Sequence, residues 1–229
     1  MRTACLCIHG FTGSPLEIEP LLSFLQKNGS WDIFAPTLPG HCDGKGCAAV
    51  RKEEWLDCVE HCLQKILEAY EHVYLVGFSM GGIIASVLAA KYPVGKLVLL
   101  SAAARYGCPK QLFSDVKGVI KDFLHGKGKS NELYRTYKPK FTRTSIGALK
   151  EFCSMVSVSA GVYGHLTLPV FIAQGMKDGM VPWRTAESLY QVIPSAEKRL
   201  YLVSEGKHMI CYCRENRLLF QEIQHFLEK

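Results

Sequence analysis

The sequence predicts an α/β domain built on a parallel β-sheet, with helices covering both faces of the sheet. Short apolar runs alternate with helical patterns along the chain, which is the order that parallel strands and their crossover helices require. The 229 residues are enough to bury a core without disulfides or a structural metal. A composition of 48% hydrophobic and 21% charged residues is that of an ordinary globular protein. One domain is expected.

The elements follow from local patterns. Strands are predicted where short apolar runs end at turn residues, and helices where apolar residues recur every three or four positions. In the first part of the chain these are a strand at 3–8, a helix at 15–27, a strand at 31–35, a helix at 53–70, a strand at 73–76, a helix at 81–91 and a strand at 96–100. Pro93 ends the third of these helices.

The alternation breaks between residues 105 and 165. Helical stripes at 112–123 and 146–156 flank a Gly/Lys-rich stretch at 126–130, without a clear strand between them. The alternation then resumes with a strand at 170–173, a helix at 185–192, a strand at 199–203 and a helix at 214–227. Residues 105–165 are therefore predicted to be a helical insertion, a cap, in a core formed by 1–104 and 166–229.

Charge is concentrated in this insertion. The chain has a formal net charge of +6, but residues 105–150 hold eleven Lys/Arg against three Asp/Glu, a local net charge of +8. A solvated face is the usual explanation of such a run, and an anionic substrate or transient contact with an anionic lipid surface is the alternative. No stripe of aromatic residues and arginines typical of nucleic-acid modules appears, so no nucleic-acid partner is predicted.

The cysteines and the apolar runs indicate a cytoplasmic protein with reduced thiols. Ten cysteines are many, but disulfide-dense scaffolds are small secreted chains. The apolar N-terminal run is too short for a signal sequence before His9 interrupts it, and no run approaches the roughly 18 residues of a membrane span. Neither secretion nor stable membrane insertion is therefore expected.

Metal binding is not predicted either. The sequence holds no CxxC pair and no HExxH string. The pairs Cys5/Cys7 and Cys58/Cys62 each share one face of a predicted strand or helix and are interpreted as core residues. Cys211 and Cys213 follow His208 closely, so their oxidation, if they are exposed, would disturb that loop.

A nucleophile motif stands at the end of the predicted strand 73–76. The residues Gly77-Phe78-Ser79-Met80-Gly81 match G-x-S-x-G and open the next helix. In this setting a sharp strand-to-helix turn exposes the serine hydroxyl, while the glycines relieve crowding around a strained backbone. Ser79 is therefore predicted to be a nucleophile, and a Gly-rich turn with an incidental serine is the alternative.

A base and an orienting acid are predicted downstream, because a serine hydroxyl alone is a poor nucleophile. Asp178 and His208 lie on loops that directly follow two later predicted strands, at the sheet edge where parallel α/β sheets hold their ligands. Glu205 is the rival acid, but it is only three residues from His208 and would have difficulty reaching the far ring nitrogen. The prediction is therefore Ser79, His208 and Asp178.

An oxyanion hole needs two N–H donors aimed at the charge of a tetrahedral intermediate. The residue after the nucleophile, Met80, supplies one N–H, and an early strand-to-helix loop supplies the other. Residues 9–14, His-Gly-Phe-Thr-Gly-Ser, form such a loop, and the Phe11 N–H is the predicted donor. The His9 side chain is expected to tie the loop down rather than to react.

Together these motifs resemble the α/β-hydrolase superfamily, and within it the small bacterial carboxylesterases and monoacylglycerol lipases. The resemblance spans nearly the whole chain and is carried by His9-Gly10-Phe11-Thr12-Gly13-Ser14, Leu38-Pro39-Gly40-His41, the Ser79 motif, Asp178 and His208. It implies Ser79 as nucleophile, His208 as base and then acid, Asp178 as orienter, an acyl-enzyme intermediate and no cofactor. Larger members begin with an antiparallel hairpin that this chain lacks, so a reduced sheet of about six strands is expected.

The predicted function is that of a serine carboxylesterase acting on short- to medium-chain acyl esters, with monoacylglycerols as one candidate class. Phe11, Met80, Ile120 and Phe123 are the candidate substrate-binding residues. The alternatives are an acyltransferase or thioesterase with the same three residues, and a ligand receptor that retains the fold without catalysis.

Overall fold

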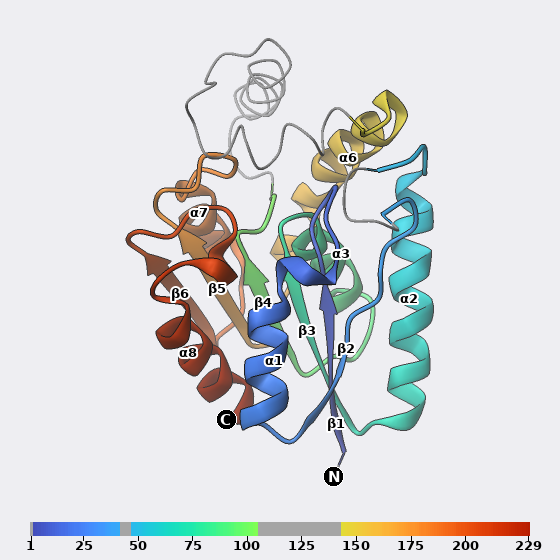
Figure 1. The fold of residues 1–229 in the computed structure, drawn as a ribbon. Helices are drawn as coiled ribbons and strands as arrows, with labels where there is room; N and C mark the ends of the chain where they lie inside the picture. Colours follow the sequence, from blue (N-terminus) through green and yellow to red (C-terminus); the bar gives the residue numbers. More distant parts are fainter. Residues whose placement is uncertain (1, 42–46, 105–142) are drawn as a thin grey trace.

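Six short strands rich in aliphatic residues form one sheet in which every neighbouring pair is parallel. In the computed structural model, residues 2–41, 47–104 and 143–229 are described. The strands are β1 Thr3–Ile8, β2 Trp31–Phe34, β3 His72–Phe78, β4 Lys96–Leu100, β5 Val170–Gly175 and β6 Lys198–Val203, in the order β2-β1-β3-β4-β5-β6. The predicted parallel sheet of about six strands is confirmed (Figure 1).

Six α-helices accompany the sheet in the described ranges. They are α1 Glu19–Asn28, α2 Lys52–Ala69, α3 Met80–Ala89, α6 Ile146–Val158, α7 Arg184–Val192 and α8 Asn216–Glu228. The helix predicted at 15–27 is divided, because a 3-10 turn at Pro15–Glu17 precedes α1. Pro20 lacks an N–H and fits only the first turn of a helix, so the α-helix begins at Glu19.

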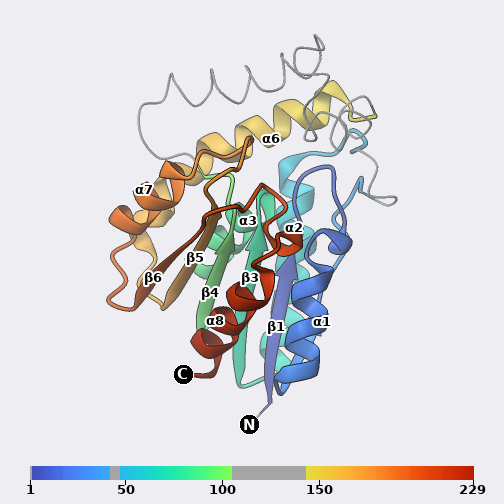
Figure 2. The same ribbon diagram turned by 60° about the vertical axis from the view of Figure 1, so that its left-hand side comes forward.

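Alternating side chains of the strands pack into two separate hydrophobic cores, one on each face of the sheet. In β1, Ala4, Leu6 and Ile8 point into a core with α2, α3, α6 and α7, whereas Cys5 and Cys7 point into a core with α1 and α8. The two views agree on this arrangement, with α1 and α8 on one face of the sheet and α2 and α3 on the other (Figures 1 and 2). Helices therefore cover both faces, as predicted.

Strand order places a crevice at one edge of the sheet. The chain passes from β1 outward to β2 and then returns to the other side of β1 to form β3. At such a reversal the helices leave β1 and β3 on opposite faces, and ligands of open α/β sheets bind beyond the carboxyl ends of those strands. The loop after β1 and the turn after β3 meet at this point.

Part of the predicted cap is described. Residues 105–142 lie outside the described ranges, but α6 forms as expected and packs against α2 and α3 through Ala148 and Met155. Phe152 is partly buried against the same core, whereas Ile146, counted in the predicted stripe, is 74% exposed at the start of the helix. That α6 belongs to a cap formed by residues 105–165 remains a proposal.

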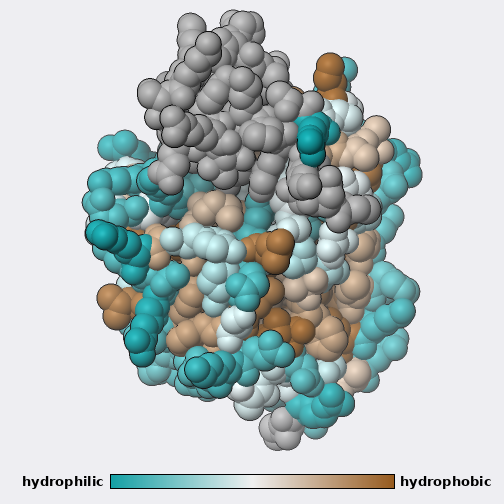
Figure 3. Space-filling model, in the orientation of Figure 1, coloured by the Kyte–Doolittle hydropathy of each residue, from teal (hydrophilic) through white to brown (hydrophobic). Residues whose placement is uncertain are grey.

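The described surface is mixed in polarity. On the face shown in Figure 3, hydrophobic residues lie near the centre and hydrophilic residues border them on both sides. None of the helices in the described ranges combines the length and the apolar character that a membrane crossing requires.

Candidate active site

The turn from β3 into α3 carries Ser79 in a conformation that few residues adopt. Its φ is 53° and its ψ is −116°, a strained combination of the kind that clusters at functional sites. Three backbone hydrogen bonds hold it, because Ser79 N donates to Leu100 O at 2.9 Å while Gly82 N and Ala103 N donate to Ser79 O at 3.0 and 3.1 Å. The surrounding chain thus fixes the hydroxyl at the end of β3.

The glycines of the motif are needed for close packing rather than for their own backbone angles. A Cβ atom at Gly77 would lie 2.4 Å from Gly81 O, and one at Gly81 would lie 2.2 Å from Ile8 O. Neither glycine has a positive φ. The turn from β3 into α3, the elbow that carries Ser79, is therefore packed so closely, within itself and against the end of β1, that no methyl group fits at Gly77 or Gly81.

Replacing Gly81 by alanine is expected to lower the free energy of unfolding by about 2 kcal/mol or more, since overpacking against a rigid backbone cannot be relieved by a side-chain rotation. Urea denaturation would measure the loss. Gly161 is the matched control, because a Cβ atom there meets nothing within 4 Å. Equal stability of the two alanine variants would contradict the packing argument.

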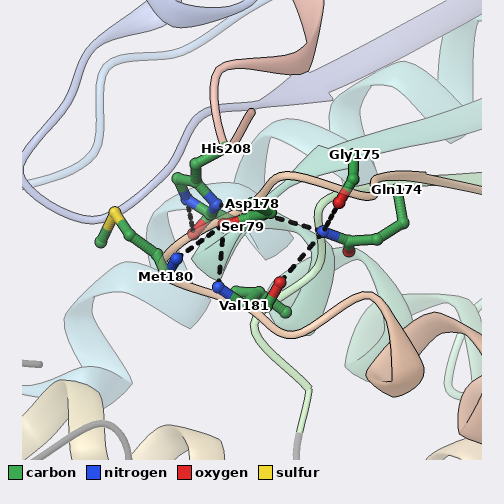
Figure 4. Close-up of polar contacts among 7 residues, drawn as sticks. All are labelled: Ser79, Gln174, Gly175, Asp178, Met180, Val181 and His208. Carbon is green, nitrogen blue, oxygen red and sulfur yellow. Dashed lines mark hydrogen bonds and ion pairs between the residues drawn. The ribbon is translucent and has the colours of Figure 1, made fainter. Parts of the chain in front are cut away.

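Three predicted residues meet through hydrogen bonds. His208 Nε2 lies 3.2 Å from Ser79 Oγ, and His208 Nδ1 lies 2.8 Å from Asp178 Oδ2 (Figure 4). The side chains of His208 and Asp178 are 3% and 0% exposed. Because a carboxylate accepts at Nδ1, the proton of a neutral ring is on Nδ1 and Nε2 is left to accept the proton of the Ser79 hydroxyl.

Asp178 is held as a carboxylate by hydrogen-bond donors on every side. Its Oδ1 accepts the N–H groups of Met180 and Val181 at 2.8 and 2.9 Å. Burial acts to raise the pKa of Asp178, but the His208 charge and the hydrogen bonds from His208, Val181 and Met180 outweigh it and lower that pKa. Glu205, the rival acid, instead pairs with Lys177 at 2.5 Å, and both of these side chains are more than half exposed.

The lowered pKa of Asp178 predicts how folding stability depends on pH. A carboxyl group with a depressed pKa stabilises the fold above its unfolded pKa, about 3.9, and that stabilisation is lost as the pH falls through the lower folded value. The wild type should therefore lose stability more steeply than an Asp178→Asn variant below about pH 4. Urea unfolding between pH 2 and 7 would measure this, and parallel curves for the two proteins would contradict it.

Gln174 was not anticipated from the sequence. It is the penultimate residue of β5, it is 1% exposed, and its Nε2 donates to Asp178 Oδ2 at 2.8 Å and to Val181 O at 3.3 Å (Figure 4). The side-chain amide therefore links the carboxylate to the loop that carries it. No motif marks a glutamine at this position, and only its burial beside Asp178 shows the contact.

The loop after β1 is tied to the rest of the site by His9. Leu38 N donates to His9 Nε2 at 3.1 Å, and Nδ1 lies 2.8 Å from Gly10 O, so the buried ring links two loops, as predicted. In the described part of the chain, the N–H groups of Phe11 and Met80 donate no hydrogen bond to the protein. These two amides are thus available at the site.

A pocket adjoins Ser79 and His208. Its remaining lining consists of Gly10, Phe11, Glu17, Phe78, Phe152 and Met180. The Phe11 ring stacks on Phe152 with 4.7 Å between their centroids. Of the predicted substrate-binding side chains, Phe11 lines the pocket, whereas that of Met80 is fully buried in the core and is not part of the lining. Met80 points inward because it opens α3 on the face that packs on the sheet.

Two other predicted pocket residues, Ile120 and Phe123, lie outside the described residues. Phe152 belongs to the apolar stripe 146–156 of the predicted cap, although it was not among the named candidates. Glu17, Phe78 and Met180 are lining residues that the sequence did not indicate. Phe78 lies next to Ser79 in the nucleophile motif, and Met180 lies two residues after Asp178. Nothing in the local sequence distinguishes Glu17 from an ordinary helix residue.

The buried cysteines do not form an accessible redox site. Cys5 and Cys7 are buried in the sheet, as predicted, whereas Cys58 and Cys62 are only partly buried on α2. Cys211 is fully buried and burial raises the pKa of its thiol, so the exposure that its oxidation would require is absent. Cys213 is only partly buried, so the effect of its oxidation on the loop stays a prediction. The described residues contain no group of three or more potential metal ligands.

Comparison with known proteins identifies the family. The family model described as "Serine aminopeptidase, S33" matches residues 1–215. The chain belongs to this family of α/β-hydrolases. Two curated relatives align with nearly the whole hydrolase. A carboxylesterase of Bacillus subtilis is 25% identical, and the alignment covers 99% of this chain and 92% of the relative. A thermostable monoacylglycerol lipase of Bacillus sp. strain H-257 is 21% identical, and the alignment covers 98% of this chain and 90% of the relative.

Solved structures share the fold of this hydrolase. One from the metagenome-derived lipolytic enzymes LipS and LipT superposes with a TM-score of 0.80 at 21% identity, covering 99% of this chain and 94% of the other. An esterase from Exiguobacterium antarcticum superposes with a TM-score of 0.74 at 20% identity, covering 99% and 92%. The α/β-hydrolase fold predicted from the motifs is confirmed.

Proposed function

We propose that this hydrolase is a serine carboxylesterase that cleaves short- to medium-chain acyl esters, including monoacylglycerols, through Ser79, His208 and Asp178. The observation that carries the proposal is the hydrogen-bonded chain from Ser79 Oγ through the His208 ring to Asp178, beside two free backbone amides. The carboxylesterase and monoacylglycerol lipase among its relatives, each matched over most of its length, support an ester substrate.

Each group has a defined role in the proposed reaction. His208 Nε2 takes the proton of Ser79 as its oxygen attacks the ester carbonyl, and the resulting oxyanion is bound by the N–H groups of Phe11 and Met80. His208 then protonates the departing alcohol, which leaves the acyl group on Ser79. A water molecule, deprotonated by His208, attacks that acyl-enzyme and releases the carboxylic acid and the free serine. Asp178 orients the ring and stabilises its charged form.

The pocket supports an apolar acyl group. Three phenylalanines, Phe11, Phe78 and Phe152, line it beside Ser79, and aromatic faces favour alkyl chains over charged groups. Phe152 comes from α6, so the proposed cap contributes a wall of the site. An acyltransferase or a thioesterase would use the same three residues with another acceptor or leaving group, and turnover assays distinguish them.

The first test is hydrolysis of p-nitrophenyl esters from acetate to palmitate by the wild type. Activity that peaks at short or medium chains supports the proposal, and a parallel assay of monoacylglycerols tests that class directly. Acyl-coenzyme A thioesters and aminoacyl amides are run beside them. Turnover of thioesters or amides without turnover of any oxygen ester would overturn the carboxylesterase assignment.

Replacing Phe152 by alanine should widen the acyl pocket. The variant is expected to raise the ratio of kcat/KM for decanoate to that for butyrate by about tenfold or more, since one methylene in an apolar pocket is worth roughly 10 to 200-fold. Phe34→Ala is the matched control, because Phe34 is 36% exposed on the edge strand β2. An unchanged chain-length profile in Phe152→Ala would remove Phe152 from the acyl site.

A further inference from the structure

A second buried carboxylate lies at the proposed catalytic pocket. Glu17 ends the short 3-10 turn that follows the oxyanion loop, residues 9–14, and it is only 5% exposed. It lines the same pocket as Ser79 and His208. Burying a carboxylate costs free energy unless its oxygens accept hydrogen bonds, so the contacts of the buried Glu17 carboxylate need an explanation.

The adjacent loop contains a strained turn. Gly13 N donates to Gly10 O at 3.3 Å, which closes a four-residue turn with Phe11 and Thr12 at its centre. Thr12 has a φ of 65°, so the positive angle falls at the third position, as in a type II turn, where glycine is preferred. A β-branched residue is an outlier at such an angle. In the described part of the chain the buried Thr12 hydroxyl also has no hydrogen-bond partner.

Glu17 is hydrogen-bonded to one end of that turn and packs against the other. Its Oε2 accepts the N–H of Gly10 at 3.1 Å. At the other end, a Cβ atom on Gly13 would lie 1.9 Å from the same oxygen. Gly13 does not have a positive φ, so a larger residue there would be opposed by contact with the carboxylate rather than by the backbone angle. The turn therefore closes around the Glu17 carboxyl group.

The residues before the turn are fixed independently. His9 is bonded to Leu38 N, and Ile8 O and His9 O lie against Gly81 so closely that no Cβ atom fits between them. Phe11 lies between these fixed residues and Glu17. In the proposed mechanism its free N–H points toward the pocket. The orientation of that amide depends on the shape of a turn that its own sequence does not favour.

We propose that Glu17 is a positioning residue that keeps the Gly10–Gly13 turn in the conformation in which the Phe11 N–H binds the oxyanion. This inference rests on the proposed function. Glu17 then acts through the loop and does not itself exchange protons with the substrate. It also explains why a carboxylate is tolerated among the phenylalanines of the pocket, since a charge-assisted hydrogen bond to Gly10 N compensates its burial.

The test compares three variants of the whole chain. Glu17→Met removes the acceptor at similar size and should lower kcat about 100-fold or more with KM within about threefold, because losing one oxyanion donor costs roughly 10² to 10³ in kcat. Glu17→Gln keeps one side-chain oxygen as acceptor and should stay within about tenfold of the wild type. Glu19→Gln, the same change on an exposed neighbour, should have no effect.

A second readout does not depend on ester turnover. A fluorophosphonate probe forms a bond from Ser79 Oγ to phosphorus with loss of fluoride, and its phosphoryl oxygen occupies the oxyanion position. The labelling rate should fall about 100-fold in Glu17→Met and remain near that of the wild type in Glu19→Gln. Gly13→Ala, which displaces the carboxylate from the other side, should also lower the labelling rate.

The outcomes separate the two proposals. Labelling of Glu17→Met within threefold of the wild-type rate would overturn the role of Glu17. If circular dichroism shows that Glu17→Met is unfolded, the test passes to Gly13→Ala. A folded Gly13→Ala that is labelled at the wild-type rate would also overturn the role of Glu17. A wild type that is labelled but hydrolyses no ester would refute the esterase function while the labelling comparison still decides the role of Glu17. A wild type that is neither labelled nor active would refute both.

Discussion

Replacing Ser79 by alanine is expected to abolish ester hydrolysis, with a fall in kcat of roughly 10⁶-fold, while the protein stays folded. In the proposed mechanism the hydroxyl is the group that attacks the carbonyl, and its Oγ lies 3.2 Å from His208 Nε2. Removing one oxygen from a 7% exposed side chain leaves the strained backbone of the elbow and its hydrogen bonds unchanged. Assays with the best p-nitrophenyl ester, on protein free of contaminating esterase, would measure the loss.

Ser86→Ala is the matched control for this experiment. Ser86 lies on the same helix, is fully buried and donates its hydroxyl to Gly82 O at 2.7 Å, so the chemical change is identical. Its kcat should stay within about twofold of the wild-type value, and its melting temperature should fall, since a net hydrogen bond of about 1 kcal/mol is lost. More than 1% residual activity in Ser79→Ala would remove Ser79 from the mechanism.

Replacing Asp178 by asparagine is expected to lower kcat about 10⁴-fold, by analogy with the same change in a serine protease. The structure supplies the reason. Both carboxylate oxygens accept: Oδ1 from the Met180 and Val181 amides, and Oδ2 from Gln174 and His208. An asparagine has only one oxygen, so its NH₂ group must face one of these two sets of donors.

The less costly placement turns the NH₂ group toward His208. Backbone N–H groups cannot reverse, but Gln174 can rotate its amide to accept and His208 can exchange its proton between ring nitrogens. His208 would then accept at Nδ1 and hold its proton on Nε2, where it can no longer take the Ser79 proton. The variant should therefore be folded and inactive, with KM little changed.

Glu205→Gln is the control that separates the two acids. Glu205 lies three residues from His208 in the sequence, as close as any acid, but its side chain is 62% exposed and pairs with Lys177. Its replacement should leave kcat within about twofold of the wild type. Full activity in Asp178→Asn together with inactivity in Glu205→Gln would transfer the orienting role to Glu205.

The sequence alone predicts the fold and the three residues proposed for catalysis, because both depend on local signals. Parallel strands buried on both faces read as short apolar runs, and each predicted strand was found within two residues of its ends. The Ser79 motif, Asp178 and His208 each follow a strand directly. All strands of a parallel sheet end at the same edge, so the sequence places these residues along one edge. The loop after β6, three strands from β3, then brings His208 back to Ser79.

Tertiary structure alone decides which neighbours complete the site. Glu17, Phe152 and Gln174 occupy a helical turn, a helix and a strand whose sequence patterns indicate burial but not the contacts of individual side chains. Their roles come from contacts with residues 4 to 141 positions away along the chain, such as Glu17 with Gly10 and Phe152 with Phe11. Met80 illustrates the converse, since its place in the motif suggested the pocket but the helix turns its side chain into the core.

The physical reason is that a local pattern indicates which positions are buried but not which partner a buried polar group will meet. Periodicity, turn residues and the strand-to-helix elbow are set by neighbours within a few positions, so they can be read from the order of the amino acids. The direction of a buried polar group is set instead by whichever donor the packed chain brings within hydrogen-bond distance of it, as Gly10 N is brought to Glu17 and Gln174 to Asp178. That pairing exists only once the two cores have formed.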